Sequence, residues 1–198
     1  MKRESLWEAQ RKENPGHSAW YISRFEAMRA EGKDLHGEAR FIDAMVPRSA
    51  RILDAGCGPG RVGGELARLG HHITGVDLDP ELVAAAIKDH PSVDWHVGDL
   101  SELNLPGQKF DLIVCAGNVM AFLAPGTARE VLQQFREYLA PDGRAVIGFG
   151  SGRGYDFETY FDDVGAAGLV PAGTFSTWDL RPFSPSSDFI VSILSPMP

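Results

Sequence analysis

The stretch Ile52-Leu53-Asp54-Ala55-Gly56-Cys57-Gly58-Pro59-Gly60 decides the fold of this chain of 198 residues. A short apolar run ends at Asp54, three glycines follow at alternate positions, and a helical pattern begins at Arg61. Glycine is needed where the backbone has a positive φ or must approach a ligand closely. The stretch therefore predicts a strand, a tight turn and a helix start, which is where α/β proteins bind nucleotide-like ligands.

The glycine-rich turn fits two motifs. In the first, an acid at Asp54 is followed by glycines at every second position. In the second, Gly58, Gly60 and Gly63 form the dinucleotide fingerprint G-x-G-x-x-G. Both motifs predict a ribose-binding acid about 20 residues further on, where Asp77 stands. The turn alone leaves both alternatives open.

Composition limits the function classes. The chain is long enough for one domain with a hydrophobic core, and 43% of its residues are hydrophobic. Its net charge of −8 argues against a nucleic-acid partner, because phosphate contacts need a basic face. Cys57 and Cys115 belong to no C-x-x-C pair, so neither a disulfide framework nor a metal site is expected. No apolar run approaches the roughly 18 residues of a membrane span, so we expect a cytoplasmic protein without membrane contact.

Strand-like and helix-like segments alternate from Arg51 onward, which predicts an α/β fold with a doubly wound parallel sheet. The expected strands are Arg51–Asp54, Ile73–Asp77, Val93–Val97, Phe110–Cys115 and Arg144–Phe149. The expected helices between and after them are Val62–Leu69, Pro80–His90, Ala128–Leu139 and one around residues 157–164. Pro141-Asp142-Gly143 predicts a turn before the fifth strand.

The two ends of the chain depart from this repeat. Residues 1–46 predict helices at Leu6–Lys12, Ala19–Ala30 and Glu38–Met45. At the other end, two strand-like runs, Gly173–Leu180 and Phe189–Leu194, are separated by only a short Pro- and Ser-rich connection. Such a connection is too short for a parallel crossover, so we expect an antiparallel hairpin.

Polar residues stand where four of the expected strands end, and these ends meet at the ligand-binding edge of a parallel sheet. With these pieces in place, the chain resembles the class I S-adenosylmethionine-dependent methyltransferases, particularly the small single-domain members. The matching segments, within residues 36–195, are Leu53–Gly60, Gly75-Val76-Asp77-Leu78, Gly98-Asp99-Leu100, Phe110–Val114 and Leu139–Arg144. The resemblance implies a Rossmann-like sheet of seven strands, the last one antiparallel, and S-adenosyl-L-methionine as cofactor.

The resemblance also implies a role for each strand end. Asp77 accepts hydrogen bonds from both ribose hydroxyls. Asp99 accepts from the adenine amine, the Leu100 N–H faces a ring nitrogen, and Leu78 packs on the adenine. The backbone of the glycine turn contacts the methionine part, and an acid there suits the ammonium group. The cofactor-binding set is completed by Asp54, Gly56, Cys57, Gly58, Gly60, Gly117 and Asn118.

The aromatic N-terminal region has two interpretations. Residues 1–35 form either a lid over the donor, in which Trp20, Tyr21 or Arg24 reaches the site, or a helical extension packed on the sheet edge. We include Trp20 and Tyr21 among the cofactor contacts, and assign residues 36–198 to the methyltransferase domain. Arg153 and Tyr155 either contact the acceptor or belong to a connecting loop.

The predicted reaction is methyl transfer to a small-molecule acceptor by in-line displacement, with no metal. No residue stands out as a general base, so the catalytic residues, the acceptor and the oligomeric state stay open. One alternative is an NAD-dependent oxidoreductase, but Asp54 beside a diphosphate would be unfavourable. A second alternative is a non-catalytic protein that binds S-adenosylmethionine.

Overall fold

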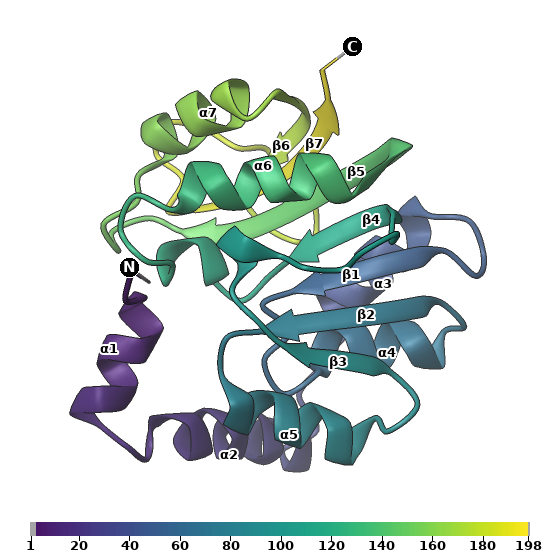
Figure 1. Cartoon of the computed structure of the whole chain (residues 1–198), viewed down its shortest axis with the longest axis vertical. Coiled ribbons are helices and arrows are strands. Elements are labelled where there is room, and N and C mark those ends of the chain that lie inside the picture. The colour runs from purple at the N-terminus through teal and green to yellow at the C-terminus, as the bar shows by residue number, and fades with distance from the viewer. Residues whose placement is uncertain (1–2, 198) are drawn as a thin grey trace.

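The central strands carry apolar side chains on both faces, and this builds a sheet with helices on both sides. The computed structural model describes residues 3–197 and contains one seven-stranded sheet in the order β3-β2-β1-β4-β5-β7-β6 (Figure 1). Strand β7 is antiparallel to both β5 and β6, which confirms the predicted doubly wound fold and its C-terminal hairpin. The strands are β1 (Arg51–Ala55), β2 (His72–Asp77), β3 (Asp94–Val97), β4 (Phe110–Cys115), β5 (Leu139–Gly150), β6 (Leu169–Phe175) and β7 (Phe189–Pro196).

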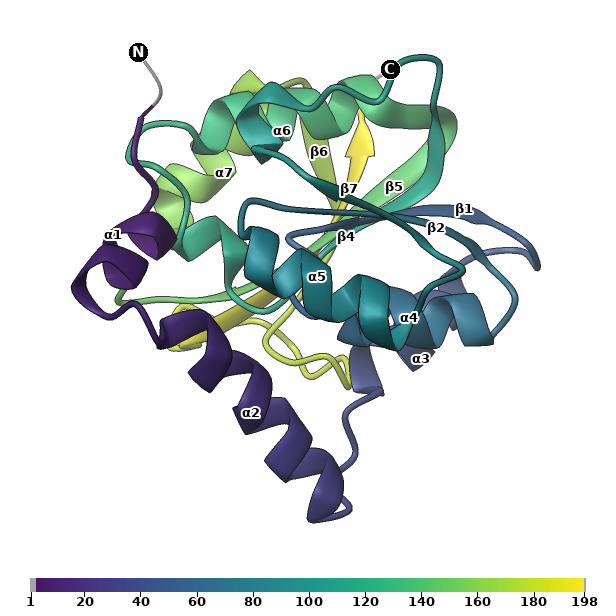
Figure 2. The same cartoon turned by 60° about the horizontal axis from the view of Figure 1, so that its bottom comes forward.

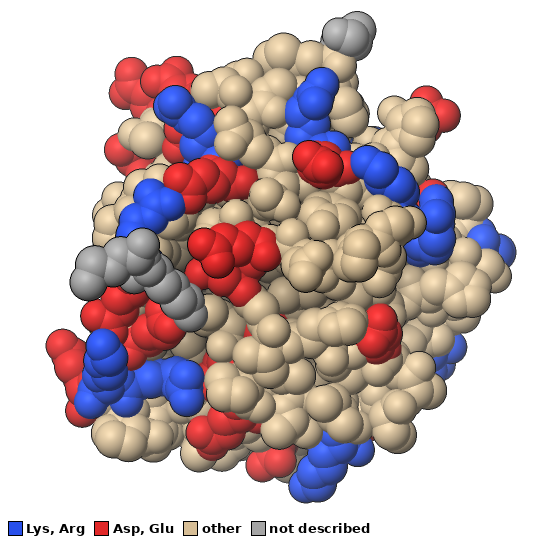
Figure 3. Space-filling model, viewed as in Figure 1, with Lys and Arg blue, Asp and Glu red and all other residues tan. Residues whose placement is uncertain are grey.

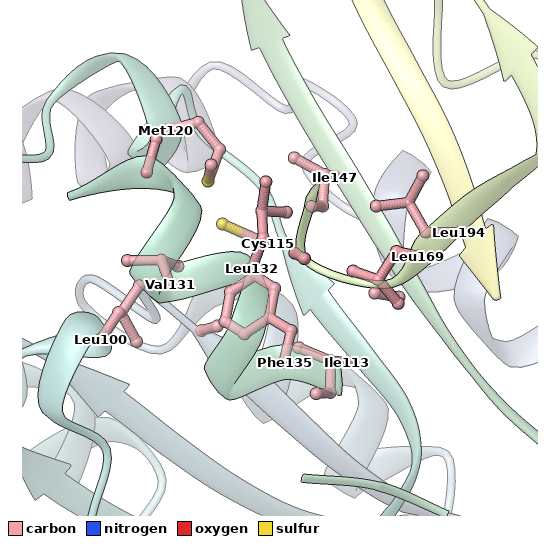
Figure 4. Close-up of a cluster of buried hydrophobic side chains, with 14 of the residues drawn as sticks. Leu100, Ile113, Cys115, Met120, Val131, Leu132, Phe135, Ile147, Leu169 and Leu194 are labelled. Carbon is pink, nitrogen blue, oxygen red and sulfur yellow. The ribbon is translucent and has the colours of Figure 1, made fainter. Parts of the chain in front are cut away.

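Alternate residues of β4 serve the two faces of the sheet. Leu112 and Val114 belong to the cluster under α3 (Gly37–Met45) and α4 (Arg61–Arg68), near α5 (Pro80–Asp89). Ile113 and Cys115 belong to the opposite cluster, under α6 (Ala128–Tyr138) and α7 (Phe157–Ala166). Figure 4 shows Val131, Leu132 and Phe135 of α6 beside these two side chains. Burial on both faces explains why β4 is almost continuously apolar.

Two N-terminal helices lie beyond the sheet. Helix α1 (Leu6–Glu13) begins with a capping box between Ser5 and Glu8, and α2 (His17–Ala30) follows it. Figures 1 and 2 show both helices away from the strands, with α2 on the side of α5, which it contacts. The predicted domain boundary after residue 35, between these helices and the methyltransferase domain, stays a prediction. Within residues 3–197, no helix is both long and apolar enough to cross a membrane.

The expected start of the sixth strand was wrong. Strand β6 begins at Leu169 and ends at Phe175, because Pro171 is tolerated in a strand at the sheet edge. Trp178 lies after the end of β6, and its ring packs over Gly148, where a Cβ would lie 2.4 Å from the ring. The expected turn at residues 141–143 is instead a bulge within β5, where the register with β4 jumps between Phe110 and Leu112.

Candidate functional site

The carboxyl ends of the parallel strands and the helices α1 and α2 enclose a cavity of about 500 Å³. This volume falls within the range of sites for small molecules. Most of the residues predicted to bind the cofactor line it together. They are Trp20, Tyr21, Gly56, Gly58, Asp77, Leu78, Asp99, Leu100, Gly117 and Asn118.

Asp77 is held in place by backbone hydrogen bonds. Its Oδ2 accepts the Gly58 N–H at 2.8 Å, and its Oδ1 accepts the Asp79 N–H at 2.9 Å. Burial raises the pKa of Asp77 to about 6, although both hydrogen bonds act in the opposite direction. Each carboxylate oxygen has a further lone pair, so the ionised group can still accept bonds from two hydroxyls of a ligand.

The glycine turn brings its backbone close to other parts of the site. Gly56 has a φ of +78°, and a Cβ there would lie 2.3 Å from Cγ2 of Val119, in the loop after β4. At Gly58, a Cβ would lie 3.8 Å from the ring of Tyr21 on α2. The turn is therefore packed against the β4 loop at Gly56 and covered by α2 at Gly58.

Asp54 and Cys57 lie beneath the glycine turn and outside the large cavity. They line a small adjoining cavity of about 30 Å³, which Tyr21 and Arg61 also border. Asp54 Oδ2 accepts the Gly63 N–H at 2.8 Å in the first turn of α4. Burial raises the pKa of Asp54 to about 7. The side chain of Cys57 belongs to the apolar cluster that contains Trp95, beside α5.

Gly60 lines neither the large nor the small cavity among the described residues, and its role as a cofactor contact stays a prediction. It precedes α4 with a φ of +81°, in the left-handed region that favours glycine. A Cβ there would lie 3.0 Å from Ala86 and 3.2 Å from Trp95. Glycine is therefore needed at this position for close packing between α4 and α5.

Asp99 and Asn118 each use one oxygen to fix their own loop. Asp99 Oδ1 accepts the N–H of Ser101 at 2.9 Å and its hydroxyl at 2.8 Å, at the start of a short 3₁₀ helix. Asn118 Oδ1 accepts the Gly150 N–H at 2.7 Å, which joins the ends of β4 and β5. The Asp99 Oδ2 and the Asn118 amide N–H groups remain as polar groups for a ligand.

Asp79 attaches the N-terminal helices to the site. Its carboxylate is fully buried and accepts hydrogen bonds from Trp7 Nε1 at 2.9 Å and from the Ser18 hydroxyl. Arg11 Nε lies 3.3 Å from the same oxygen. Since the Asp79 N–H also binds Asp77, the contact point of α1 and α2 adjoins the predicted ribose acid. Sequence reasoning missed this role, because Asp79 before Pro80 predicts only a helix cap, which it also is.

Aromatic rings from three segments form one side of the cavity, which we call the aromatic wall: Trp7, His17, Trp20, Tyr21 and Phe122. The Trp7 ring meets those of His17, Tyr21 and Phe122 with centroids 4.7, 5.3 and 5.9 Å apart. The sequence shows that Trp7 and His17 belong to predicted helices, but it does not show that the Trp7 ring contacts Phe122.

The loop after β5 contributes one of its two candidate residues. Arg153 lines the cavity, and its guanidinium lies 5.4 Å from the centroid of the Phe122 ring. Tyr155 instead donates a hydrogen bond to Asp163 Oδ2 at 3.1 Å and stacks on Phe149. Tyr155 thus belongs to the connecting loop and packs on α7 and β5, and it does not line the cavity among the described residues.

The position of Asp54 disfavours a dinucleotide. In dinucleotide-binding folds, the pyrophosphate lies at the N-terminus of the helix that follows the glycine turn. Here the buried Asp54 carboxylate already accepts a backbone N–H in the first turn of that helix, α4. An anion at the same place would be repelled by the ionised form of Asp54 and would compete with it for the backbone N–H groups.

The comparisons with known proteins decide the family. Residues 52–143 match a family described as a methyltransferase domain. A solved structure of a TehB-like SAM-dependent methyltransferase from Corynebacterium glutamicum is 48% identical, with a TM-score of 0.89, covering 92% of this chain and 100% of that one. The chain belongs to the class I S-adenosylmethionine-dependent methyltransferase family. Its cofactor is S-adenosylmethionine, as the sequence predicted, and the alternative of NAD is not supported.

More distant relatives are also methyltransferases by name. A dTDP-3-amino-3,6-dideoxy-alpha-D-glucopyranose N,N-dimethyltransferase from Streptomyces fradiae is 30% identical over 73% of this chain and 54% of the relative. The chain thus spans about half the length of the curated relatives that it matches first. SAM-bound CalS10, an amino pentose methyltransferase from Micromonospora echinaspora, has the same fold, with 22% identity, a TM-score of 0.69, and coverage of 86% of this chain and 96% of that one.

Proposed function

We propose that this chain transfers the methyl group of S-adenosylmethionine to a small-molecule acceptor. The observation that carries the proposal is the half-buried Asp77 carboxylate, which backbone N–H groups hold at the edge of a cavity that α1 and α2 border. In the reaction, the methyl carbon bonds to a nucleophilic atom of the acceptor as its bond to sulfur breaks. The electron pair stays on sulfur, giving S-adenosylhomocysteine, and the acceptor proton leaves to solvent. Alignment and exclusion of water supply most of the catalysis.

The donor is assigned to the residues that suit its parts. Asp77 takes the ribose hydroxyls, Asp99 and the Leu100 N–H take the adenine, and the glycine turn takes the methionine part. Arg24 lines the cavity one turn after Tyr21 and forms neither a hydrogen bond nor an ion pair within residues 3–197, so it suits the donor carboxylate. The Asp54 carboxylate lies beneath the turn, near the place of the ammonium.

We assign no catalytic base, since the sulfonium already makes sulfur a good leaving group. The acceptor is proposed to be a small molecule because the chain carries a net charge of −8. Figure 3 shows Lys and Arg side chains interspersed with Asp and Glu on the face that it presents, rather than a basic stripe. The two buried cysteines are unpaired, which is compatible with a cytoplasmic location.

The test combines calorimetry, thermal melting and turnover. S-adenosylhomocysteine should bind at micromolar strength and stabilise the fold by about 2.7 kcal/mol at a hundredfold excess over its dissociation constant. Asp77→Ala should lose most of this effect, whereas Asp163→Asn, a buried acid on α7, should keep it. A folded protein that shows neither heat nor a melting shift at millimolar ligand would refute the proposal. Donor binding without release of S-adenosylhomocysteine across a metabolite panel would favour the non-catalytic alternative.

A further inference from the structure

Two arginines of the cavity lack the partners that other arginines have. Eleven arginine side chains in residues 3–197 reach a carboxylate or a backbone carbonyl. Those of Arg24, Arg29 and Arg153 make neither contact within that range, and two of them, Arg24 and Arg153, line the cavity. Each of these two lies against a ring instead, Arg24 at 5.9 Å from Phe25 and Arg153 at 5.4 Å from Phe122. Both guanidinium groups are available to an anionic ligand.

The methyl donor brings only one carboxylate. Arg24 follows Tyr21 by one helical turn, and the Tyr21 ring covers Gly58 of the turn assigned to the methionine part. Arg24 is thus the nearer candidate for the donor carboxylate. Arg153 belongs to the loop after β5 and lies against Phe122, in the segment after β4. Arg153 and Phe122 line the same cavity, and we assign the part beside them to the acceptor.

The same space is bordered by the aromatic wall. Trp7 meets Tyr21 and Phe122 edge-on, at interplanar angles of 82° and 86°. The Trp20 side chain remains 53% exposed although it stacks on His17. Such rings bind flat apolar groups well, because they bury large areas at little entropic cost.

The carboxylates that line the cavity have other assignments. Glu38 forms an ion pair with Arg61, while Asp77 and Asp99 are assigned to the donor. No carboxylate of residues 3–197 is paired with Arg153. An acidic group on the acceptor would therefore meet a cation without a competing anion.

We propose that the acceptor is an aromatic acid. Its ring packs on the aromatic wall, and its carboxylate or phosphate binds the Arg153 guanidinium, which leaves its nucleophilic atom toward the sulfonium. This inference rests on the proposed methyl transfer and names the substrate class for that site.

The test measures binding to protein saturated with S-adenosylhomocysteine, by calorimetry. The acids are benzoate, 4-hydroxybenzoate, indole-3-acetate and phenyl phosphate, and the neutral analogues are the methyl esters of the two benzoates and indole-3-acetamide. We expect the acids to bind about tenfold or more tightly than the neutral analogues, as is usual for a charge-assisted bidentate contact. Comparing the dissociation constants of phenyl phosphate and benzoate shows whether the site prefers a phosphate or a carboxylate.

Three variants distinguish a direct contact between Arg153 and the acid from a general effect of positive charge. Arg153→Gln should abolish the preference for acids and leave the affinity for S-adenosylhomocysteine unchanged, and Arg153→Lys should retain part of the preference. Arg29→Gln is the matched control, because Arg29 is also unpaired but does not line the cavity. It should behave like the unmodified protein.

The outcomes distinguish this inference from the proposed function. It is overturned if no acid binds the loaded protein at millimolar concentration, if acids and neutral analogues bind equally, or if Arg153→Gln keeps the preference. Failure of S-adenosylhomocysteine to bind the unmodified protein would instead overturn the methyl-transfer proposal itself.

Discussion

Asp79→Asn should release the N-terminal helices from the donor site. The carboxylate of Asp79 is the acceptor that Trp7 and Ser18 share, and Arg11 pairs with it. An asparagine can keep the hydrogen bond from the Glu81 N–H that caps α5. Its amide group would, however, bring N–H donors or an uncharged oxygen to a place where three donors converge.

The expected size follows from these contacts. A hydrogen bond to a charged group contributes about 1.5–3 kcal/mol, and Arg11 adds little because its side chain is 31% exposed. Since contacts that share one oxygen are not additive, we expect the closed position of α1 and α2 to lose about 3 kcal/mol. That energy corresponds to a shift of roughly a hundredfold toward the open position. The affinity for S-adenosylhomocysteine falls by no more than this factor, in proportion to the closed fraction that is lost.

Hydrogen exchange and calorimetry check this prediction. Residues 6–30 should exchange faster in Asp79→Asn, and S-adenosylhomocysteine should restore part of their protection, including that of Trp20–Phe25. Asp163→Asn is the control, because that buried acid pairs with Arg129 on the far helix layer. The reasoning is refuted if Asp79→Asn leaves residues 6–30 as protected as before, or if the control variant loosens them equally.

Four further outcomes are expected. Asp77→Ala should weaken S-adenosylhomocysteine binding by about 1.5–3 kcal/mol in calorimetry; an unchanged dissociation constant would remove this residue from the ribose site. Gly56→Ala should lower the free energy of unfolding by about 1–3 kcal/mol in urea, because its Cβ would overlap Val119 at a positive φ. The double variant Gly56→Ala with Val119→Ala should relieve the overlap but keep the backbone strain. Equal losses of unfolding free energy in the single and double variants would contradict this reasoning. The pKa values of Asp54, about 7, and of Asp77, about 6, exceed the value of about 3.9 in unfolded chains. The free energy of unfolding of the ligand-free protein should therefore fall as the pH rises from about 4 to 7. The donor ammonium favours the charged Asp54, so S-adenosylhomocysteine should bind about tenfold more tightly at pH 8 than at pH 6, and this difference should shrink in Asp54→Asn.

Part of the site was predictable because its geometry is local. Asp77 follows an apolar run and ends β2, and parallel strands end at one edge of a sheet, so its place in the cavity followed from the order of elements. The packing that requires glycine at position 60 is not local, since it comes from Ala86 and Trp95 on neighbouring elements. The local reasoning failed at Trp178, whose ring packs on Gly148 and does not belong to a strand.

The sequence by itself determined the alternation of strands and helices, the glycine turn and the acids at the strand ends. Apolar periodicity, chain reversals and positive φ angles depend on residues close together in the chain, so a sequence displays them directly. Only the tertiary structure decided that Trp7 binds Asp79, 72 residues away, and that Phe122 joins both Trp7 and Arg153 at one cavity. No local pattern names the partner of a buried carboxylate or an unpaired guanidinium, because that partner is selected by how whole elements pack.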